Sequence, residues 1–303
     1  PKYLFLWGLG RAADASILNY LSMFLLYYYN QVLGLQAMYV SLALALATIV
    51  DAVSDPLIGI KSDSASNRGK KRTAFMVYGI AACSLFLPLL FFGNLAASQL
   101  VLFIQLVFYA SSLRIALSFF TIPREAIGVQ LLQGYSDRNK LWATSSGFYI
   151  FGSAISIGPI LLFFITDWNS RLGYLYATAW VLFLYVLFSS LCTLSLRNYE
   201  NDRVRIQQKG NRLTNFNLIQ AYSSLLKNRS WFMLFLGCTI FSVQFGVSAG
   251  TNVYVNQFFW YWGPSDVFWG GSLSIFGSIC GVLFVFFKPK IDKKFVAVTC
   301  GFG

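Results

Sequence analysis

The stretch MYVSLALALATIVDAVSDPLIGIKSDSASNRGKKR, residues 38–72, contains the pattern that decides the fold. Its first part, residues 38–60, is apolar apart from small hydroxyl residues, one tyrosine and two aspartates. A run of this length forms an α-helix that can cross a hydrocarbon core about 30 Å thick. The basic segment that follows predicts a water-exposed loop at the end of a membrane-spanning helix.

The rest of the chain repeats this alternation. Of its 303 residues, 57% are apolar and 11% are charged, compared with roughly 45–50% and 25% in soluble domains. We therefore expect an all-α polytopic membrane protein. Because the chain starts at Pro1 and stops at Gly303 within an apolar run, we expect a fragment with eight transmembrane helices and part of a ninth. The runs lie at about 4–29, 38–60, 73–92, 99–122, 141–166, 172–196, 230–262 and 266–287, with the ninth starting near Phe295.

Basic residues are concentrated in alternate loops. With the N-terminus placed in the cytoplasm, the inner loops contain 20 of the 23 Lys and Arg residues and the outer loops only Arg171. This asymmetry predicts a cytoplasmic N-terminus and a cell-membrane location. The domain prediction is an N-terminal six-helix bundle over 1–196, a cytoplasmic linker with an amphipathic helix over 197–229, and the first part of a C-terminal bundle over 230–303.

Composition also excludes several function classes. The chain has no histidine and no clustered cysteines, which removes most metal and nucleophile sites and makes an enzyme a poor interpretation. The net charge of +12 is spread over loops between apolar runs rather than collected on one soluble face, so we expect no nucleic-acid partner. We also expect no cofactor, a lipid environment and a monomer.

Three acids, Asp14, Asp51 and Asp55, lie inside the predicted spans. An ionisable side chain there costs about 2.5–3.5 kcal/mol and normally faces a cavity or a partner charge. Asp51 and Asp55 are one helical turn apart and therefore share a face. Two such carboxylates should share a proton or hold a cation between their oxygens. We therefore expect Asp51 and Asp55 to be able to bind Na⁺. Pro56 leaves the Ala52 carbonyl without its helical N–H partner and so adds an oxygen nearby.

The fourth and seventh helices add polar side chains to this set. On the fourth, a stripe with spacings of three and four includes Arg114, which cannot lose its charge on burial. We expect Asp14 or one of the acids of the second helix to pair with it. The stripe comprises Ser111, Arg114, Ser118, Thr121 and Glu125, and the seventh helix offers Gln244, Ser248, Thr251, Asn252 and Asn256.

Several segments together resemble the glycoside/pentoside/hexuronide cation symporters, the melibiose-carrier family of the major facilitator superfamily. The segments are DAVSDPLIG followed by KSDSASNRGKKR, LLYYYNQVLGL, TIPREAIGVQL, YSDRNKL and TNVYVNQFFWYW. The resemblance implies a twelve-helix carrier whose coupling-cation site is formed by Asp51, Ser54, Asp55 and Ser118. It also implies a gating loop that contains Gly59, Asp63, Arg68, Lys70, Lys71 and Arg72.

The sugar-contacting positions of that family match less well. Its carboxylate on the first helix falls at Ala15, next to Asp14, its partner on the fourth helix falls at Thr121, and its fifth-helix arginine falls near Ser146. Arg114 offers a replacement for the missing arginine. The residues expected to contact the solute are Asp14, Ser22, Arg114, Thr121, Glu125, Gln244 and Asn252.

The leading hypothesis is therefore a symporter that carries a glycoside, sugar or sugar acid together with Na⁺ or H⁺ by alternating access. Two alternatives stay open. A lysophospholipid symporter of the same fold would suit the 30 Phe residues. A non-transporting membrane receptor would use the deep acids only as structural pairs, and their neutralisation would then impair folding instead of coupling.

Overall fold

The computed structural model describes residues 2–68, 71–92, 98–131, 135–204, 228–272 and 277, and its regular secondary structure in these ranges is helical. Residues 264–272 also form a helix. The elements are α1 (Lys2–Tyr20), η1 (Leu21–Leu25), η2 (Tyr28–Val32), α2 (Ala37–Asn67), α3 (Thr73–Phe91), α4 (Gln99–Leu131), α5 (Tyr135–Pro159), η3 (Ile160–Phe164), α6 (Arg171–Val204), α8 (Arg229–Tyr254) and η4 (Val255–Phe259).

Six helical segments in the described part of the chain are long and apolar enough to cross a membrane. Their bounds are Ala37–Ser66, Thr73–Phe91, Gln99–Leu131, Lys140–Phe164, Arg171–Asn201 and Arg229–Phe259. The predicted first span is helical from Lys2 through η2, but its polar residues keep it out of these six. Most of the predicted eighth span and all of the ninth lie outside the described residues, so the predicted number of helices stays a prediction.

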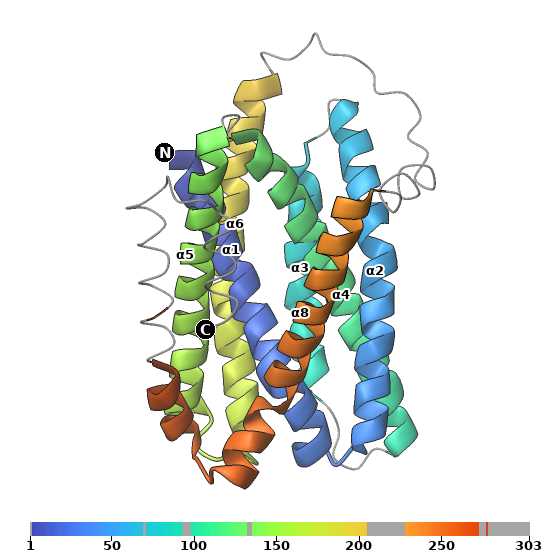
Figure 1. The fold of residues 1–303 in the computed structure, drawn as a ribbon, viewed down its shortest axis with the longest axis vertical. Helices are drawn as coiled ribbons and strands as arrows, with labels where there is room; N and C mark the ends of the chain where they lie inside the picture. Colours follow the sequence, from blue (N-terminus) through green and yellow to red (C-terminus); the bar gives the residue numbers. More distant parts are fainter. Residues whose placement is uncertain are drawn as a thin grey trace.

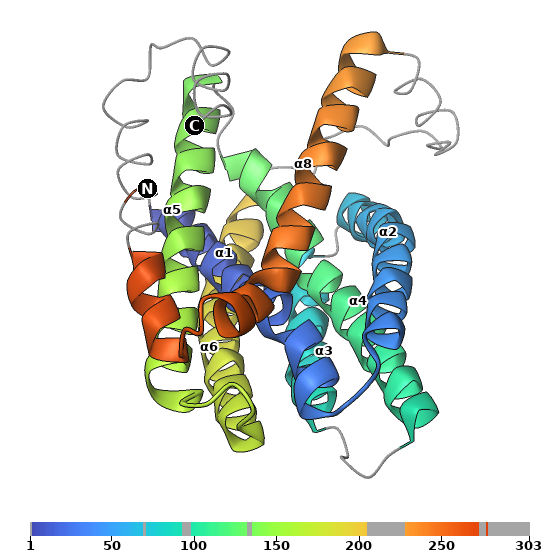
Figure 2. The ribbon, with the colours of Figure 1, turned by 60° about the horizontal axis from the view of Figure 1, so that its bottom comes forward.

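The helices form two groups that lie side by side in Figure 1. In one group α1 packs against α5 and α6, and in the other α4 packs against α2 and α3. Contacts between α3 and α6, and between α1 and α4, join the groups. Figure 2 shows α8 leaning across this assembly, where its lower part approaches η1. The middle of the bundle is therefore enclosed by α1, α2, α4 and α8.

Glycine allows two of these contacts to be very close. A Cβ atom on Gly152 of α5 would lie 2.4 Å from the carbonyl oxygen of Ala12 on α1. On Gly79 of α3 it would lie 2.7 Å from the backbone nitrogen of Phe120 on α4. Small residues at helix crossings bring backbones together in membranes, where packing contributes much of the helix association.

Three predicted loop boundaries are wrong. α2 continues from the predicted end at 60 to Asn67, α4 continues through Pro123 to Leu131, and α6 continues to Val204. Hydropathy marks where the membrane ends, whereas backbone hydrogen bonds continue the helix into the aqueous region. Of the predicted linker, residues 205–227, including the amphipathic stretch 216–227, lie outside the described residues.

Candidate functional site

The two aspartates of α2 converge on one hydroxyl group of α4. The Ser118 Oγ lies 3.3 Å from Asp51 Oδ1 and 2.5 Å from Asp55 Oδ1. It also lies 3.1 Å from the Arg114 carbonyl oxygen. A hydroxyl has one hydrogen and can donate to only one of these acceptors at a time. The structure thus places the Ser118 hydroxyl within hydrogen-bond distance of both Asp51 and Asp55, and the role of the three residues as a cation site stays a prediction.

Arg114 is the counter-ion of this carboxylate pair. Its Nη1 donates to Asp51 Oδ2 at 3.2 Å, and the two side chains are 36% and 28% exposed. Of the partners expected for Arg114, the structure selects an acid of the second helix. With both acids ionised, the group of Asp51, Asp55 and Arg114 has one net negative charge. One proton or one monovalent cation would neutralise it.

Ser54 does not join these groups through its hydroxyl. Its Oγ donates to the Asp51 carbonyl oxygen at 3.1 Å, a bond within α2. Hydroxyl groups in helices often bond to a carbonyl one turn earlier, so a shared face does not establish side-chain direction. The described residues contain no cluster of three or more His, Cys, Asp or Glu side chains that could hold a metal ion. A Na⁺ ion would depend on carboxylate, hydroxyl and carbonyl oxygens.

These groups line a cavity of about 560 Å³ bounded by α1, η1, α2, α3, α4, α5 and α8. Such a volume lies within the range of small-molecule sites. Most of the lining is apolar, and the polar residues are few and grouped. They are Asn19, Ser22, Asp51, Asp55, Arg114, Ser118, Thr121 and Tyr149.

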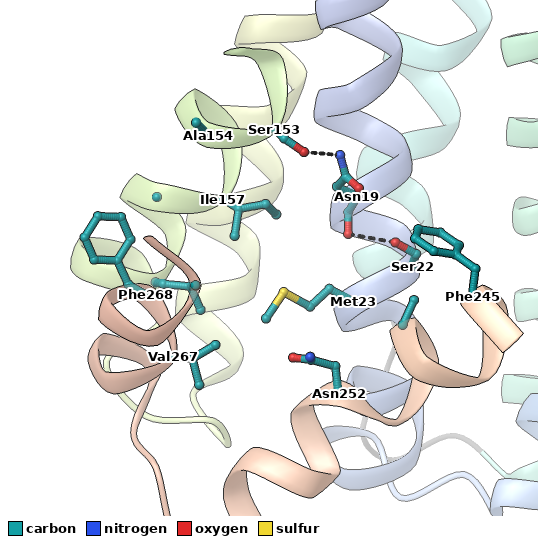
Figure 3. Close-up of a pocket in the computed structure, with 14 residues that line it drawn as sticks. Asn19, Ser22, Met23, Ser153, Ala154, Ile157, Phe245, Asn252, Val267 and Phe268 are labelled. Atoms are coloured by element: carbon teal, nitrogen blue, oxygen red, sulfur yellow. Dashed lines mark hydrogen bonds between the residues drawn. The ribbon is translucent and has the colours of Figure 1, made fainter. Parts of the chain in front are cut away.

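A second cavity of about 320 Å³ adjoins the first and shares Asn19, Ser22, Phe245 and Ala249 with it. Figure 3 shows Met23 pointing into this space, with Phe268 and Val267 on the side opposite Asn19. No charged residue is among its described lining residues. The site thus combines a charged chamber with an uncharged, mainly apolar one.

Asp14 belongs to a different, fully buried ion pair. Arg124 Nη2 donates to Asp14 Oδ2 at 2.7 Å, and both side chains are at most 1% exposed. Thr121 Oγ1 donates to Asp14 Oδ1 at 3.2 Å. Asp14 is not among the lining residues of the two cavities, so its predicted contact with a solute stays a prediction.

The sequence interpretation missed Arg124 because it counted this residue with the basic loop that follows the apolar run 99–122, although it continued the polar stripe of the fourth helix to Glu125. The guanidinium carbon lies 5.3 Å from the Trp7 ring and 5.9 Å from the Phe120 ring. The Nε and Nη1 atoms of Arg124 have no hydrogen-bond acceptor among the described residues. The faces of the two rings attract the guanidinium cation instead. A usable signal was present, since Arg124 follows Thr121 by three positions and therefore continues the polar face of the helix.

The remaining predicted solute residues are dispersed. Ser22 and Thr121 line the charged chamber, and Ser22 and Asn252 line the apolar one. Glu125 accepts from Arg124 Nη2 at 2.8 Å. Neither Glu125 nor the exposed Gln244 is among the lining residues of these chambers. The structure therefore does not bring these two side chains to the solute cavity in this conformation.

The predicted gating loop contains an ion pair between its two ends. Arg72 Nη2 donates to Asp63 Oδ1 at 2.8 Å and connects the start of α3 with α2. Gly59 and Arg68 lie on and just after α2, and Lys71 precedes α3, whereas Lys70 lies outside the described residues. The gating role of these residues stays a prediction.

Glu200 adds a contact that the sequence interpretation missed. Its carboxylate accepts from the backbone N–H groups of Arg72 and Thr73 at 3.0 and 3.1 Å, and from the Thr73 hydroxyl at 2.8 Å. A carboxylate satisfies the free N–H groups at a helix start and interacts favourably with the helix dipole. Glu200 therefore fixes α3 to α6 at the end of the bundle where Arg72 pairs with Asp63.

Contacts at the other end of the bundle connect the six N-terminal helices with the segment around η4. The Tyr27 hydroxyl donates to Gln257 Oε1, and the Tyr254 hydroxyl donates to Asn30 Oδ1 at 2.9 Å. Trp168 Nε1 donates to the Trp262 carbonyl at 3.0 Å. We call these residues the aromatic clasp. Among the described residues, the aromatic clasp connects helices α1–α6 with the segment around η4 at this end of the bundle.

Loss of the Arg124–Asp14 pair should destabilise the protein. Removing one partner of a buried ion pair costs about 3–5 kcal/mol. Glu125 at 2.8 Å from Arg124 and Arg11 at 3.9 Å from Asp14 would compensate the remaining charge only in part. We expect Arg124→Gln and Asp14→Asn each to lower the thermal unfolding temperature in detergent, and the double variant to unfold later than the sum of both losses predicts. Lys61→Gln, on an exposed lysine, is the control. Strict additivity of the two losses would contradict the pairing.

Comparisons with known proteins agree with this architecture. An uncharacterized symporter of Synechocystis sp. is 29% identical over 156 residues, which are 50% of this chain and 29% of the relative. The uncharacterized symporter YjmB of Bacillus subtilis is 23% identical over 303 residues, covering 95% of the chain and 61% of the relative. A proposed 2,3-dihydroxypropane-1-sulfonate exporter of Escherichia coli is 23% identical over 300 residues, with the same two coverages.

The chain thus spans less than two thirds of the length of each of these relatives. Residues 6–297 match the family described as MFS/sugar transport protein, where MFS is the major facilitator superfamily. Since this match extends over nearly the whole chain, the chain belongs to the family of MFS/sugar transport proteins.

Proposed function

We propose that the full-length protein is a secondary symporter of the cell membrane that carries a sugar, glycoside or sugar acid together with Na⁺ or H⁺. The observation that carries the proposal is the convergence of Asp51, Asp55, Ser118 and Arg114 on one cavity. Ionisable groups that face a cavity inside a membrane mark an ion or substrate path. The names of two relatives as symporters support the same class.

In this proposal the carboxylates provide the coupling. The net negative charge of the Asp51, Asp55 and Arg114 group is unfavourable in a low dielectric, and a bound proton or Na⁺ removes it. Neutralisation then releases Arg114 from part of its attraction to Asp51, so that the guanidinium can bind the solute. By linkage, cation and solute strengthen each other's binding by the same factor.

An anionic solute fits this arrangement. A guanidinium offers a planar set of donors that matches carboxylates and phosphates. The relative named for a hydroxylated sulfonate supports a small anion with hydroxyl groups. The apolar chamber favours one further candidate, a lysophospholipid or another amphipathic solute whose apolar part would occupy the space around Met23 and Phe268. Uptake assays with sugar acids and with lysophospholipids distinguish the two.

The aromatic clasp supports alternating access. We infer from the distribution of basic residues among the loops that the clasp faces the extracellular side. The cavity would then be closed to the outside, and release of the clasp would open it. The Asp63–Arg72 pair and Glu200 would act at the cytoplasmic end. In the same orientation the N-terminus lies in the cytoplasm.

Neutralising the carboxylates should separate coupling from folding. We expect Asp51→Asn and Asp55→Asn to express at the membrane but to lose accumulation of solute against its gradient, while downhill exchange persists. Ser118→Ala should reduce accumulation more than Ser54→Ala, because only Ser118 contacts both acids. Expression, gradient-driven uptake and exchange are measured for each variant in the full-length protein. Well-folded aspartate variants that still concentrate solute would contradict the coupling role, and misfolding of both would favour a receptor with structural acids.

Arg114→Lys tests the anion-binding role. Lysine keeps the charge near Asp51 but loses the planar fork, so solute affinity should fall about tenfold or more, which corresponds to roughly 1.4 kcal/mol. Arg229→Lys, on an exposed arginine outside the lining of both chambers, is the matched control. Solute binding to purified protein is the measurement. Unchanged affinity in Arg114→Lys would leave this residue only a structural counter-ion.

Tyr27→Phe tests the aromatic clasp. The variant keeps the ring but removes the hydroxyl that bonds to Gln257, so the outward-open state should gain population. The measurement is the rate at which an impermeant thiol reagent, added outside, labels Ala249→Cys in a background without native cysteines. We expect several-fold faster labelling, with Tyr39→Phe as a control outside the clasp. An unchanged rate would show that the clasp does not control external access.

A further inference from the structure

A groove of about 320 Å³ lies between the start of α3 and the end of α6, on the outside of the bundle. Its lining contains two cations, Lys71 and Arg197, and no acidic residue. It also includes Val77, Tyr78 and Leu194. None of these residues lines the solute chambers, so the groove needs a separate explanation.

The two cations lack counter-ions within the described part of the chain. The salt bridges there include neither Lys71 nor Arg197. Two acids near the groove whose side chains the structure describes have other partners, since Asp63 pairs with Arg72 and Glu200 accepts from the backbone at the start of α3. Two positive charges on one groove therefore attract an anion from outside these residues.

The remaining lining of the groove is apolar and exposed. The exposed fractions are 53% for Val77, 70% for Tyr78 and 59% for Leu194. Val77 and Tyr78 lie six and seven residues after Lys71, which is about 9–11 Å further along the helix axis at 1.5 Å per residue. An exposed tyrosine near a charged helix end is typical of the membrane interface. The groove thus has two cations at one end and exposed apolar side chains next to them. This arrangement matches a lipid with an anionic headgroup and an adjoining acyl chain.

We propose that this groove binds an anionic phospholipid of the cytoplasmic leaflet, with its phosphate between Lys71 and Arg197 and its acyl chain along Val77, Tyr78 and Leu194. Basic pockets between transmembrane helices on the cytoplasmic side suit such headgroups. The chain that follows α6 is a poor occupant, because residues 205–227 contain four Lys and Arg and no acid. A free phosphate would leave the apolar part of the groove uncovered.

The lipid would also act on the helix contact beside it. Thr73, another lining residue, bonds through its hydroxyl to Glu200 of α6. A phosphate held between Lys71 of the α3 end and Arg197 of the α6 end would therefore strengthen the same α3–α6 contact. Bound lipid should raise the stability of the protein as any ligand of the native state does.

The test compares lipid binding by the full-length protein and by Lys71→Gln/Arg197→Gln. Purified protein is titrated with phosphatidylglycerol or phosphatidylcholine, and retained lipid is counted by native mass spectrometry alongside the thermal unfolding temperature. We expect the wild type to retain phosphatidylglycerol selectively and to be stabilised by it. The double variant should bind it at least about tenfold more weakly, since each cation near an anionic surface contributes roughly a fewfold to tenfold.

Two further variants make the outcome decisive. Lys61→Gln/Arg229→Gln removes two cytoplasmic charges outside the groove and should keep the selective binding. Lys71→Arg/Arg197→Lys keeps both charges and should keep most of it, even if the glutamine variant folds poorly. Equal phosphatidylglycerol binding in the wild type and the folded glutamine variant would overturn the proposal. Saturation of the same site by inorganic phosphate alone, with no added gain from the lipid, would also overturn it.

Discussion

Ionisable side chains inside a membrane need partners, and α4 supplies them for Asp14 of α1 and for the two aspartates of α2. Towards α2, Arg114 and Ser118 bond to Asp51 and Asp55. Towards α1, Thr121 and Arg124 bond to Asp14. These four residues of α4 recur every three or four positions and therefore form one polar face. The placement of α1 and α2 around the cavity depends on this face.

The two ends of that polar face differ in solvent exposure. We assign a structural role to the buried end and a functional role to the exposed end. Arg124 and Asp14 are fully buried among aromatic rings, where a charge pair fixes two helices against each other. Arg114 and Asp51 are about one third exposed and line the cavity, where a solute or an ion can reach them. The same chemistry on one helix thus gives an internal support at one point and a proposed coupling site at another.

Spacing along a helix was enough to predict that Asp51 and Asp55 share one face inside a long apolar run. Their grouping with Ser118 was implied by the family resemblance and not by spacing. Spacing could not predict the direction of a small side chain, and Ser54 turned to its own backbone. Hydropathy also misled where helices extend beyond the apolar runs, and Arg124 was counted as a basic loop residue although the polar stripe of the fourth helix was continued to Glu125. The Glu200 cap on α3 joins residues 127 and 128 positions apart, a contact that no local pattern contains.

The central claim is that the carboxylate pair couples solute movement to a cation, and uptake under imposed gradients tests it most directly. The full-length protein is reconstituted in proteoliposomes with a Na⁺ gradient, a H⁺ gradient or neither, and accumulation of labelled sugar acids and glycosides is followed. We predict that one of the two gradients drives accumulation of at least one solute above its external concentration and that its collapse releases the solute. Uptake that stops at equilibrium under every gradient would contradict cation coupling.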